Sequence, residues 1–389
     1  MNKTIIADEM MLTKDCPTTA GSKMLEGYQS LLEAEVLTRL KGAGFQIGEK
    51  AKVGEFAIDL AGETAFDGAV SENDKLKNHA AQLLKEEKGI GAIGLEVNGS
   101  IRRGAAQNEL ISVKPTYGTI SRYGTIPVVC SGETVSVTAQ EVATIREILD
   151  VIAGHDEKDG TSLSEKECAC LKKGFEGKKV SRVAVLKSMK QGIDAEVSAK
   201  LDAFCSFLSK NGIEVCEVED EVICLSRIAW NILMCAELCN NVSRYDGVKY
   251  GYRSENFTNI DELYTNSRTE AFGDVLKTAI LFGSETLSTE NYMKVYDKAL
   301  RTRRVISEAF GALFEEYDAV LMPVCSKMEY TTEQVKENKY LAFEENFYTA
   351  PASITGLPAV TAGGVQLVGA AFSDASLLDV AQLYEKEGK

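Results

Sequence analysis

The chain has 389 residues, of which 44% are hydrophobic and 26% are charged, and its formal net charge is −15 at pH 7. This composition is typical of a folded globular protein, and the length allows a large core. The excess of negative charge disfavours direct nucleic-acid binding by this chain alone, because a phosphate backbone attracts lysine- and arginine-rich surfaces.

The first element that the sequence predicts is a helix with one apolar face. Leu32, Val36 and Leu40 predict a helix over residues 29–45, and a strand-like stretch follows at 45–60. The next segment, 67–88, differs from its surroundings because it is polar and charged, with a short helical pattern only at its end.

In the second half of the sequence, predicted helices and strands alternate more regularly. Thr138 and Glu141 match a capping box before an apolar stripe, which predicts a helix over residues 138–154. Further helices are expected at 195–212 and 291–317, and strands at 178–188, 213–219 and 318–324. Such alternation predicts an α/β protein whose sheet is covered by helices. Because no linker interrupts it, one domain over residues 1–389 is expected.

The ten cysteines indicate reduced thiols rather than a metal centre. They form no Cys-x-x-Cys pair, and only two histidines could join them as zinc ligands. Cys235 and Cys239 have the spacing of two thiols on one helix face. No signal peptide opens the chain, and no apolar run reaches the about 20 residues of a membrane span. We therefore expect a cytoplasmic protein with no membrane segment, no metal and no cofactor.

The stretch "GLEVNGSIRRGAAQNELISVKPTYGTISRYG" (residues 94–124) resembles the core of the amidase signature family. The segments "PTTAGSKMLEGY", "AGHDEKDGTS", "SRYDGVKYGYRSENFTNIDELYTNSRTEAFG" and "PASITGLPAV" are similar to one branch of it, the A subunit of the tRNA-dependent amidotransferases. The resemblance implies the amidase-signature fold, a large mixed β-sheet between layers of α-helices.

The resemblance also implies a proton relay. The family uses a serine nucleophile, a second serine in a cis peptide and a buried lysine base, and backbone N–H groups just before the nucleophile hold the oxyanion. Ser100 falls at the nucleophile position. Val97, Asn98 and Gly99 fall at the positions that line the oxyanion site.

Two relay positions depart from the family pattern. Leu76 falls at the cis-serine, within the segment 67–88 that replaces the family's Gly/Ser-rich loop, and Asp8 falls at the lysine. A leucine has no proton to pass, so the relay is expected to be inactive. Ser71 is the nearest hydroxyl that could replace the serine, after a loop rearrangement, and Lys75 or Lys77 could then supply a base.

Two other lysines do not restore the base. Lys14 belongs to a later Thr-Lys pair of the family pattern, and Lys3 lies in an expected frayed terminus. The family's helical N-terminal region, which precedes the lysine position, has no counterpart in this sequence.

The glutamine pocket of the family is altered in the same way. Trp230 falls at a pocket tyrosine, Ala279 at the arginine that binds the substrate's α-carboxylate, and Asn346 at the aspartate that binds its α-ammonium. A lost hydrogen bond to a charged group costs about 1.5–3 kcal/mol. We expect the three side chains to lie close to one another and to Ser100, in a pocket without a cationic anchor. Alternatively, Trp230 is core filler.

The same residues also have purely structural interpretations. Ser100 is then a turn serine whose catalytic role has been lost, and it is expected on a tight loop at the edge of the sheet. Arg102 and Arg103 are interpreted as a solvated or helix-end pair, Glu96 as a partner for an arginine or an N–H group, and the Lys-Pro-Thr-Tyr-Gly motif at 114–118 as the start of a strand.

Three functions remain open. The one we favour is a non-catalytic pseudo-subunit or partner-binding protein, whose partners would be the B and C subunits of a tRNA-dependent amidotransferase or a complete A subunit. The others are an active A subunit that hydrolyses glutamine, and an amidase for another amide with a rewired base beside Ser100. The active A subunit needs the full relay and the ionic pocket, whereas the rewired amidase needs only a base.

Overall fold

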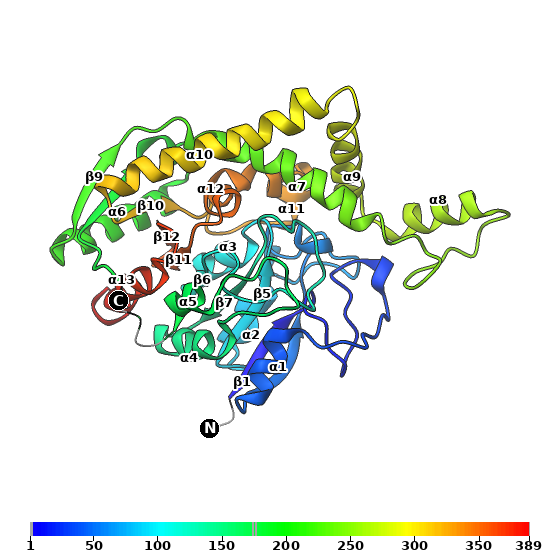
Figure 1. Cartoon of the computed structure of the whole chain (residues 1–389), viewed down its shortest axis with the longest axis horizontal. Coiled ribbons are helices and arrows are strands. Elements are labelled where there is room, and N and C mark those ends of the chain that lie inside the picture. Colours follow the sequence, from blue (N-terminus) through cyan, green and yellow to red (C-terminus); the bar gives the residue numbers. More distant parts are fainter. Residues whose placement is uncertain (1–2, 173–174, 176, 389) are drawn as a thin grey trace.

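The computed structural model describes residues 3–172, 175 and 177–388, and in this part of the chain ten strands form one mixed sheet. Their order is β2-β1-β5-β7-β6-β11-β12-β10-β8-β9 (Figure 1). The strands are β1 Thr4–Asp8, β2 Gln46–Ala51, β5 Gly91–Glu96, β6 Ile111–Lys114, β7 Thr134–Ala139, β8 Arg182–Leu186, β9 Glu214–Val218, β10 Ala319–Pro323, β11 Ala359–Ala362 and β12 Val365–Gly369. A separate hairpin pairs β3 Ser71–Glu72 with β4 Lys75–Leu76.

Helices cover the sheet and extend beyond it. They are α1 Glu35–Gly42, α2 His79–Lys85, α3 Ser100–Gln107, α4 Val142–Ile152, α5 Glu165–Cys168, α6 Ala195–Lys210, α7 Ser226–Val242, α8 Ile260–Ala271, α9 Asp274–Thr286, α10 Asp297–Glu316, α11 Thr332–Glu337, α12 Leu341–Thr355 and α13 Asp374–Glu387. Short 3₁₀ segments are η1 Lys23–Leu25, η2 Glu55–Ala57, η3 Ala169–Leu171, η4 Lys187–Lys190 and η5 Ile223–Leu225, and η6 Tyr292–Tyr296 is a π-helix.

β5 shows why the sheet is buried on both faces. All six of its residues are buried, and it lies between β1, which is parallel to it, and β7, which is antiparallel. A side chain at Gly91 would meet Ile148 of α4, and one at Gly94 would meet Asp8 and Ile101 of α3. Since residues three apart point to opposite faces of a strand, α3 and α4 cover opposite sides.

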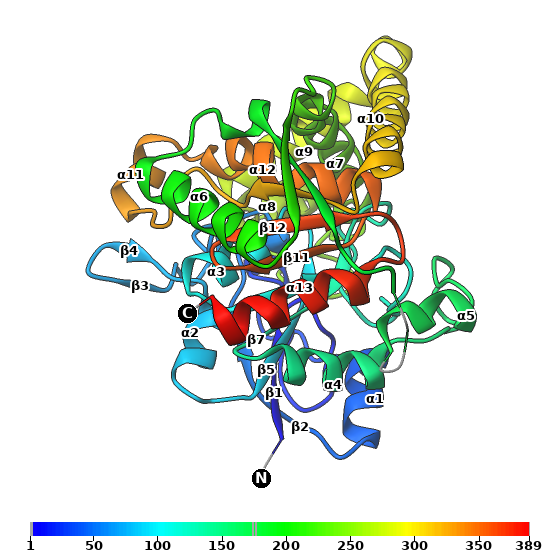
Figure 2. The same cartoon turned by 90° about the vertical axis from the view of Figure 1, so that its left-hand side faces the viewer.

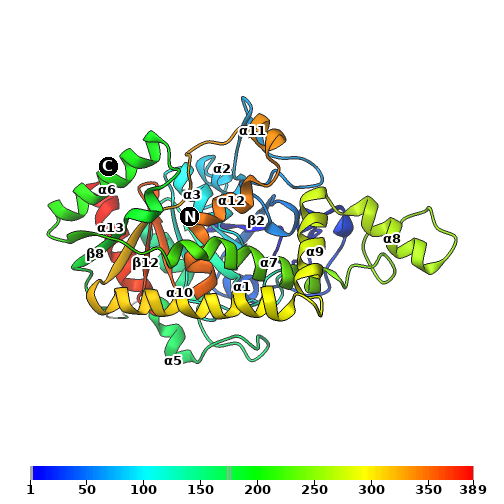
Figure 3. The same cartoon turned by 90° about the horizontal axis from the view of Figure 1, so that it is seen from above.

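The helices divide into two groups. On the α4 side, α1, α4 and α13 lie next to one another (Figure 2). Beyond the middle of the sheet, α7 packs against α9, α10 and α12, and α8 projects away from the body (Figures 1 and 3). Three of these helices, α7, α9 and α12, carry the predicted pocket residues described below.

The α/β prediction is confirmed, and most of the expected elements are present. α6 covers 195–210 with Val197, Leu201, Phe204 and Leu208 buried, and β8, β9 and β10 fall inside the predicted strands. The predicted helix over 291–317 is π-helical in its first turn and α-helical from Asp297 onward. The strand predicted over 45–60 ends earlier, at Ala51.

Two helix starts differ from the prediction. α1 begins at Glu35, so Leu32 precedes it and is 50% exposed. The capping box at 138–141 is wrong, because Thr138 belongs to β7 and α4 begins at Val142. Thr138 pairs with strands on both sides, through Ala92 of β5 and Ser112 of β6. Pairing in the middle of a sheet therefore overrides the local capping signal.

Two features are absent from the described residues. None of the helices there combines the length and the apolar character that a membrane crossing requires. The same residues contain no group of three or more His, Cys, Asp or Glu side chains placed to hold a metal ion.

Candidate active site

Ser100 begins α3 directly after the turn that leaves β5. Gly99 has φ +89°, a left-handed conformation that favours glycine, and a Cβ there would lie 2.4 Å from the Cβ of Thr349 on α12. The strand–turn–helix arrangement therefore needs a glycine before the serine. Ser100 is only 7% exposed and lies at the end of an interior strand, not at an edge strand of the sheet.

The turn is held from both sides by side chains. Thr349 donates its hydroxyl to the carbonyl oxygen of Asn98 (3.0 Å), and Arg103 donates to the same oxygen (2.9 Å). The Asn98 amide donates to the carbonyl of Asp59 (2.9 Å). In the described part of the chain the backbone N–H groups of Asn98 and Gly99 donate to no acceptor. Two of the three residues assigned to the oxyanion site, Asn98 and Gly99, thus keep an available N–H group.

The two arginines of α3 are fully buried, so they are not a solvated pair, but they lie in the first turn of the helix, which agrees with the helix-end alternative. Arg102 forms an ion pair with Glu96, which confirms the predicted arginine contact of that glutamate. Arg102 also donates to Gln366 (2.7 Å), to the carbonyl of Thr349 (3.0 Å) and to Ser353 (3.1 Å). This network joins β5, the strand before Ser100, to α12 and β12.

A small cavity adjoins Ser100 between α2, α3 and the ends of β1 and β5. Its volume is about 30 Å³, enough for about two water molecules. Polar groups that line it include Asp8, Asp59, Asn78 and Ser100, and Lys52 also contributes to the wall. The ammonium group of Lys52 forms an ion pair with Asp67, half-exposed at the surface.

Asp8 lies at the carboxyl end of β1 and faces this cavity. Its Oδ1 accepts the N–H of Met10 (3.0 Å) and its Oδ2 accepts the N–H of Leu95 (2.8 Å). Burial raises its pKa to about 7, although the two N–H groups oppose the shift. The position at which the resemblance places a lysine base thus holds a buried acid with a shorter side chain, beside a cavity.

Asp59 is the second buried acid beside Ser100. Its Oδ2 accepts the N–H of Gly54 (2.9 Å), whereas Oδ1 receives no well-aligned hydrogen bond. Burial raises the pKa of Asp59, and the Gly54 N–H, Arg103 and the nearby Ser100 hydroxyl oppose that shift. Asp59 could not be recognised as a site residue from the sequence, because nothing in the local pattern brings position 59 to position 100.

The other relay candidates lie elsewhere. Leu76 packs into a separate apolar cluster with Leu60, Cys325 and Tyr330, and it does not line the cavity. Ser71 is exposed on the opposite strand of the β3–β4 hairpin. In the part of the chain that is described, no lysine ammonium forms a hydrogen bond with the Ser100 hydroxyl. Asn78, which caps the start of α2, lines the cavity, whereas Leu76 and Ser71 do not.

The buried acid at position 8 predicts a pH effect on stability. A folded-state pKa of about 7, above the unfolded value of 3.8, means that the folded chain binds the proton more tightly. Its contribution to stability is therefore complete below about pH 4 and is lost as the pH rises towards 7. Relative to Asp8→Asn, the wild-type chain should lose more than about 1 kcal/mol of unfolding free energy between pH 5 and pH 8.

Urea unfolding of both proteins at the two pH values measures this. The hydrogen-bond cost of the asparagine itself is common to both pH values and cancels in the comparison. A difference between the two proteins that stays constant with pH would contradict the assignment of Asp8 as a buried neutral acid.

The three predicted pocket residues lie on helices that pack together, and one of these helices, α12, contacts the Gly99–Ser100 turn. Trp230 on α7, Ala279 on α9 and Asn346 on α12 are each at most 1% exposed. Asn346 donates to Asn231 of α7 (2.8 Å) and lies one helical turn before Thr349, which contacts the Gly99 turn. None of the three lines the cavity beside Ser100. Their role as the remnant of a glutamine pocket stays a prediction.

The indole of Trp230 lies against Gly132. A Cβ at Gly132 would lie 2.4 Å from the ring, and the carbonyl of Ser353 is close by. The indole N–H has no hydrogen-bond partner. The ring therefore fills space in the core between α7, α12 and the loop before β7.

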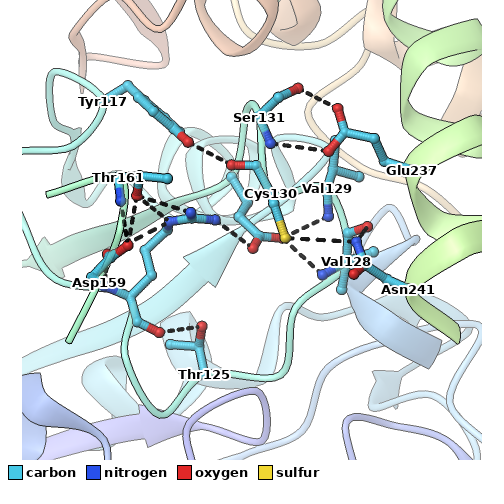
Figure 4. A network of polar contacts seen from close by, with 12 residues as sticks. Tyr117, Thr125, Val128, Val129, Cys130, Ser131, Asp159, Thr161, Glu237 and Asn241 are labelled. Carbon is cyan, nitrogen blue, oxygen red and sulfur yellow. Dashed lines mark hydrogen bonds and ion pairs between the residues drawn. The ribbon is translucent and has the colours of Figure 1, made fainter. Parts of the chain in front are cut away.

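The loop before β7 is fixed by a polar network (Figure 4). Tyr117 donates to the carbonyl of Cys130 (2.6 Å), and Asn241 of α7 donates to the carbonyl of Val128 (2.9 Å). Glu237 of α7 accepts the N–H of Ser131 (3.0 Å). These bonds hold α7, and with it Trp230, against the loop that contains Gly132.

The Lys-Pro-Thr-Tyr-Gly motif follows a strand and does not start one, so that prediction is wrong, although its contacts are structural. Lys114 ends β6, is fully buried and donates to the carbonyl of Leu357 (2.9 Å). Burial, aided by the charge of Arg102, lowers the pKa of Lys114 to about 7. Thr116 donates its N–H (2.8 Å) and its hydroxyl (2.6 Å) to Asp374 at the start of α13.

These features define a class of protein: an α/β fold with a glycine–serine turn at the end of an interior strand, free N–H donors before the serine, and a buried ionic core behind it. A profile of the Amidase family matches residues 87–378. The chain belongs to this family.

Its relatives and structural neighbours include A subunits of amidotransferases. The chain is 31% identical over 402 residues to the A subunit of the glutamyl-tRNA(Gln) amidotransferase of Coxiella burnetii, covering 98% of this chain and 83% of the relative. Its counterpart in Lachnoclostridium phytofermentans is 32% identical over 411 residues, with 98% and 82% covered. The fold is similar to the crystal structure of the Thermotoga maritima counterpart, with a TM-score of 0.81, 24% identity and 99% and 83% coverage.

Proposed function

We propose that this chain is a non-catalytic member of the amidase family that serves as a partner-binding pseudo-subunit in tRNA-dependent amidation. The observation that carries the proposal is the replacement of the base: the cavity beside Ser100 is lined by two buried carboxyl groups, those of Asp8 and Asp59. The wall has no serine hydroxyl besides that of Ser100, and Leu76 lies in a different cluster.

The charge of this cavity argues against the family's relay. A lysine base takes up a proton and leaves a cation behind the nucleophile position, whereas at this position both oxygens of the Asp8 carboxyl accept backbone N–H groups, those of Met10 and Leu95. A serine hydroxyl is almost entirely un-ionised at that pH and needs a positioned base to attack an amide. The free N–H groups before Ser100 would stabilise an oxyanion only after such an attack.

The partners of the relatives suggest the partners of this chain. The relatives are named as A subunits of an amidotransferase, and this chain is similar to them over nearly its whole length. We propose the B and C subunits of such an enzyme, or a complete A subunit, as its partners, and the cytoplasm as its location. Co-purification of the tagged chain with a B/C pair from a related organism tests the first of these.

The activity test measures ammonia release from glutamine and asparagine. The purified chain, alone or with the B/C pair, should show no turnover above background, and Ser100→Ala should behave identically. In serine hydrolases, loss of the catalytic groups leaves only about 10³–10⁴-fold acceleration over water. A complete A subunit of a relative, measured with the same B/C pair, serves as the positive control.

A second candidate function follows from Asp59. Because its carboxyl lies beside the Ser100 hydroxyl and its pKa is raised, it could act as a rewired base for an amide other than glutamine. Turnover that Ser100→Ala abolishes would overturn the pseudo-subunit proposal. If Asp59→Asn abolishes the same turnover while Asp8→Asn keeps it, Asp59 is the base.

A further inference from the structure

The cavity beside Ser100 has room for a small molecule and reaches the surface. Its volume of about 30 Å³ takes about two water molecules, or about two non-hydrogen atoms. Both carboxyl groups that line it, those of Asp8 and Asp59, are buried. The lining residues that are partly exposed are Lys52, Val53, Asn78, Ala80 and Ile101.

The two carboxyl groups have more acceptor positions than the protein uses. An ionised carboxyl group has about four. Asp8 uses two of them for backbone N–H groups, and Asp59 accepts one N–H group at Oδ2. The Oδ1 atom of Asp59 is buried and receives no well-aligned hydrogen bond. Arg103 offsets part of the Asp59 charge but donates to carbonyl oxygens of the backbone. A buried acceptor without a donor is costly, so a donor molecule in the cavity would be stabilising.

Asp8 also lacks a paired cation among the described residues. The charge of Lys50 on β2 acts on Asp8, but the Lys50 ammonium donates to the hydroxyl of Thr18 (2.7 Å) and to two carbonyl groups. Lys52 of the cavity wall forms an ion pair with Asp67 instead. An ionised Asp8 therefore lines the cavity without a counter-ion, and one monovalent cation would neutralise it.

The rest of the cavity wall is mainly apolar and includes several small side chains. Ala51, Ala81, Ala92 and Ala105 line the cavity and belong to one apolar cluster. Divalent cations need about six oxygen ligands, and the described residues contain no group of three or more His, Cys, Asp or Glu side chains placed to hold a metal ion. A wall that combines free carboxylate acceptors with methyl groups instead fits a cation that carries N–H donors and a small apolar part.

We propose that this cavity binds a small primary ammonium ion, methylammonium, whose N–H groups donate to the carboxyl groups and whose methyl group contacts the alanines. Methylammonium has two non-hydrogen atoms, which matches the volume, and its charge-assisted hydrogen bonds use acceptors that the protein leaves free. The inference rests on the proposed function in one respect, because the carboxyl groups act as ligands and not as a base for Ser100.

Urea unfolding at pH 8 and constant ionic strength tests the inference. At this pH Asp8, with a pKa of about 7, is mostly ionised, whereas a primary ammonium ion keeps its charge. Methylammonium chloride at about 50 mM should lower the unfolding equilibrium constant at least about fivefold relative to sodium chloride, because a ligand of the folded chain stabilises it. Tetramethylammonium chloride should act like sodium chloride, because this ion is larger and has no N–H donor.

Matched variants locate the site. Asp8→Asn should abolish the methylammonium response, because it removes the unpaired charge. Glu9→Gln is the control, since Glu9 is the next acid in the chain, accepts the hydroxyl of Thr19 (2.8 Å) and does not line the cavity. It should keep the response. Ala81→Leu should abolish the response with both carboxyl groups retained, because the larger side chain fills the cavity from α2.

A direct binding measurement accompanies the unfolding data. Saturation-transfer NMR on the methyl protons of methylammonium should show contact with the wild-type chain and with Glu9→Gln, and none with Asp8→Asn or Ala81→Leu. Circular dichroism checks that each variant is folded.

Three results would overturn the inference. The first is an equal effect of methylammonium and sodium on the wild-type chain, which would mean that the cavity holds only water. The second is an unchanged response in Asp8→Asn, and the third is a response that Glu9→Gln loses as completely as Asp8→Asn does. Amide turnover that Ser100→Ala abolishes would contradict the pseudo-subunit proposal alone, because the binding measurements do not depend on turnover.

Discussion

Arg102→Ala should lower the free energy of unfolding by about 3–5 kcal/mol, and it is expected to be among the most damaging single changes in the chain. Removing the guanidinium leaves Glu96 as an uncompensated charge at a position with no solvent contact. It also removes the donors to Gln366, Thr349 and Ser353, which tie α12 to the nucleophile turn. Urea unfolding followed by circular dichroism measures the loss.

The surface arginine Arg301 provides the matched control. It forms an ion pair with Asp297, but its side chain is 69% exposed. Arg301→Ala should therefore cost no more than about 1 kcal/mol. The double variant Glu96→Gln, Arg102→Met should be less destabilised than Arg102→Ala, because no buried charge remains unpaired. If Arg102→Ala and Arg301→Ala cost the same, the buried network does not stabilise the fold.

Trp230→Ala should also lower the free energy of unfolding by about 3–5 kcal/mol, because it empties the space between α7, α12 and Gly132. Trp230→Phe should cost clearly less. Phenylalanine keeps most of the ring and removes the indole N–H, which is buried without a partner. Circular dichroism must be the probe, since Trp230 is the only tryptophan.

A double-mutant cycle tests the contact with Gly132. A Cβ at this position would lie 2.4 Å from the indole, so Gly132→Ala should cost about 1–3 kcal/mol by overpacking. In the Trp230→Phe background the smaller ring should relieve most of that cost. A penalty for Gly132→Ala that is equal in both backgrounds would show that the ring does not fill this space.

The interpretation of Trp230 as core filler and as the occupant of a former pocket need not conflict. The ring lies on α7, which also carries Asn231, the partner of Asn346, and α12 continues from Asn346 to the Gly99 turn. If Trp230→Ala remains folded, the space that it leaves is bounded by α7, by α12, which carries Asn346, and by the loop that contains Gly132. Soaking or titration with glutamine would show whether a site reopens there.

The sequence by itself determined the fold class, several of the helices and strands, and the position of Ser100 on a turn. Apolar periodicity is local, so α6, β9 and β10 follow from their own residues, as does the turn that Gly99 and Ser100 form. The family could also be recognised from the sequence, because its motifs are continuous segments of the chain.

Only the tertiary structure decided what surrounds Ser100. Asp59 reaches the cavity from a segment well before the serine, and Leu76 turns away into another cluster, although both precede the serine in the same half of the chain. The burial of Arg102 likewise depends on Gln366 and Thr349, which are distant in sequence. The charge, burial and partners of a side chain depend on contacts between distant segments, and a linear pattern does not contain those contacts.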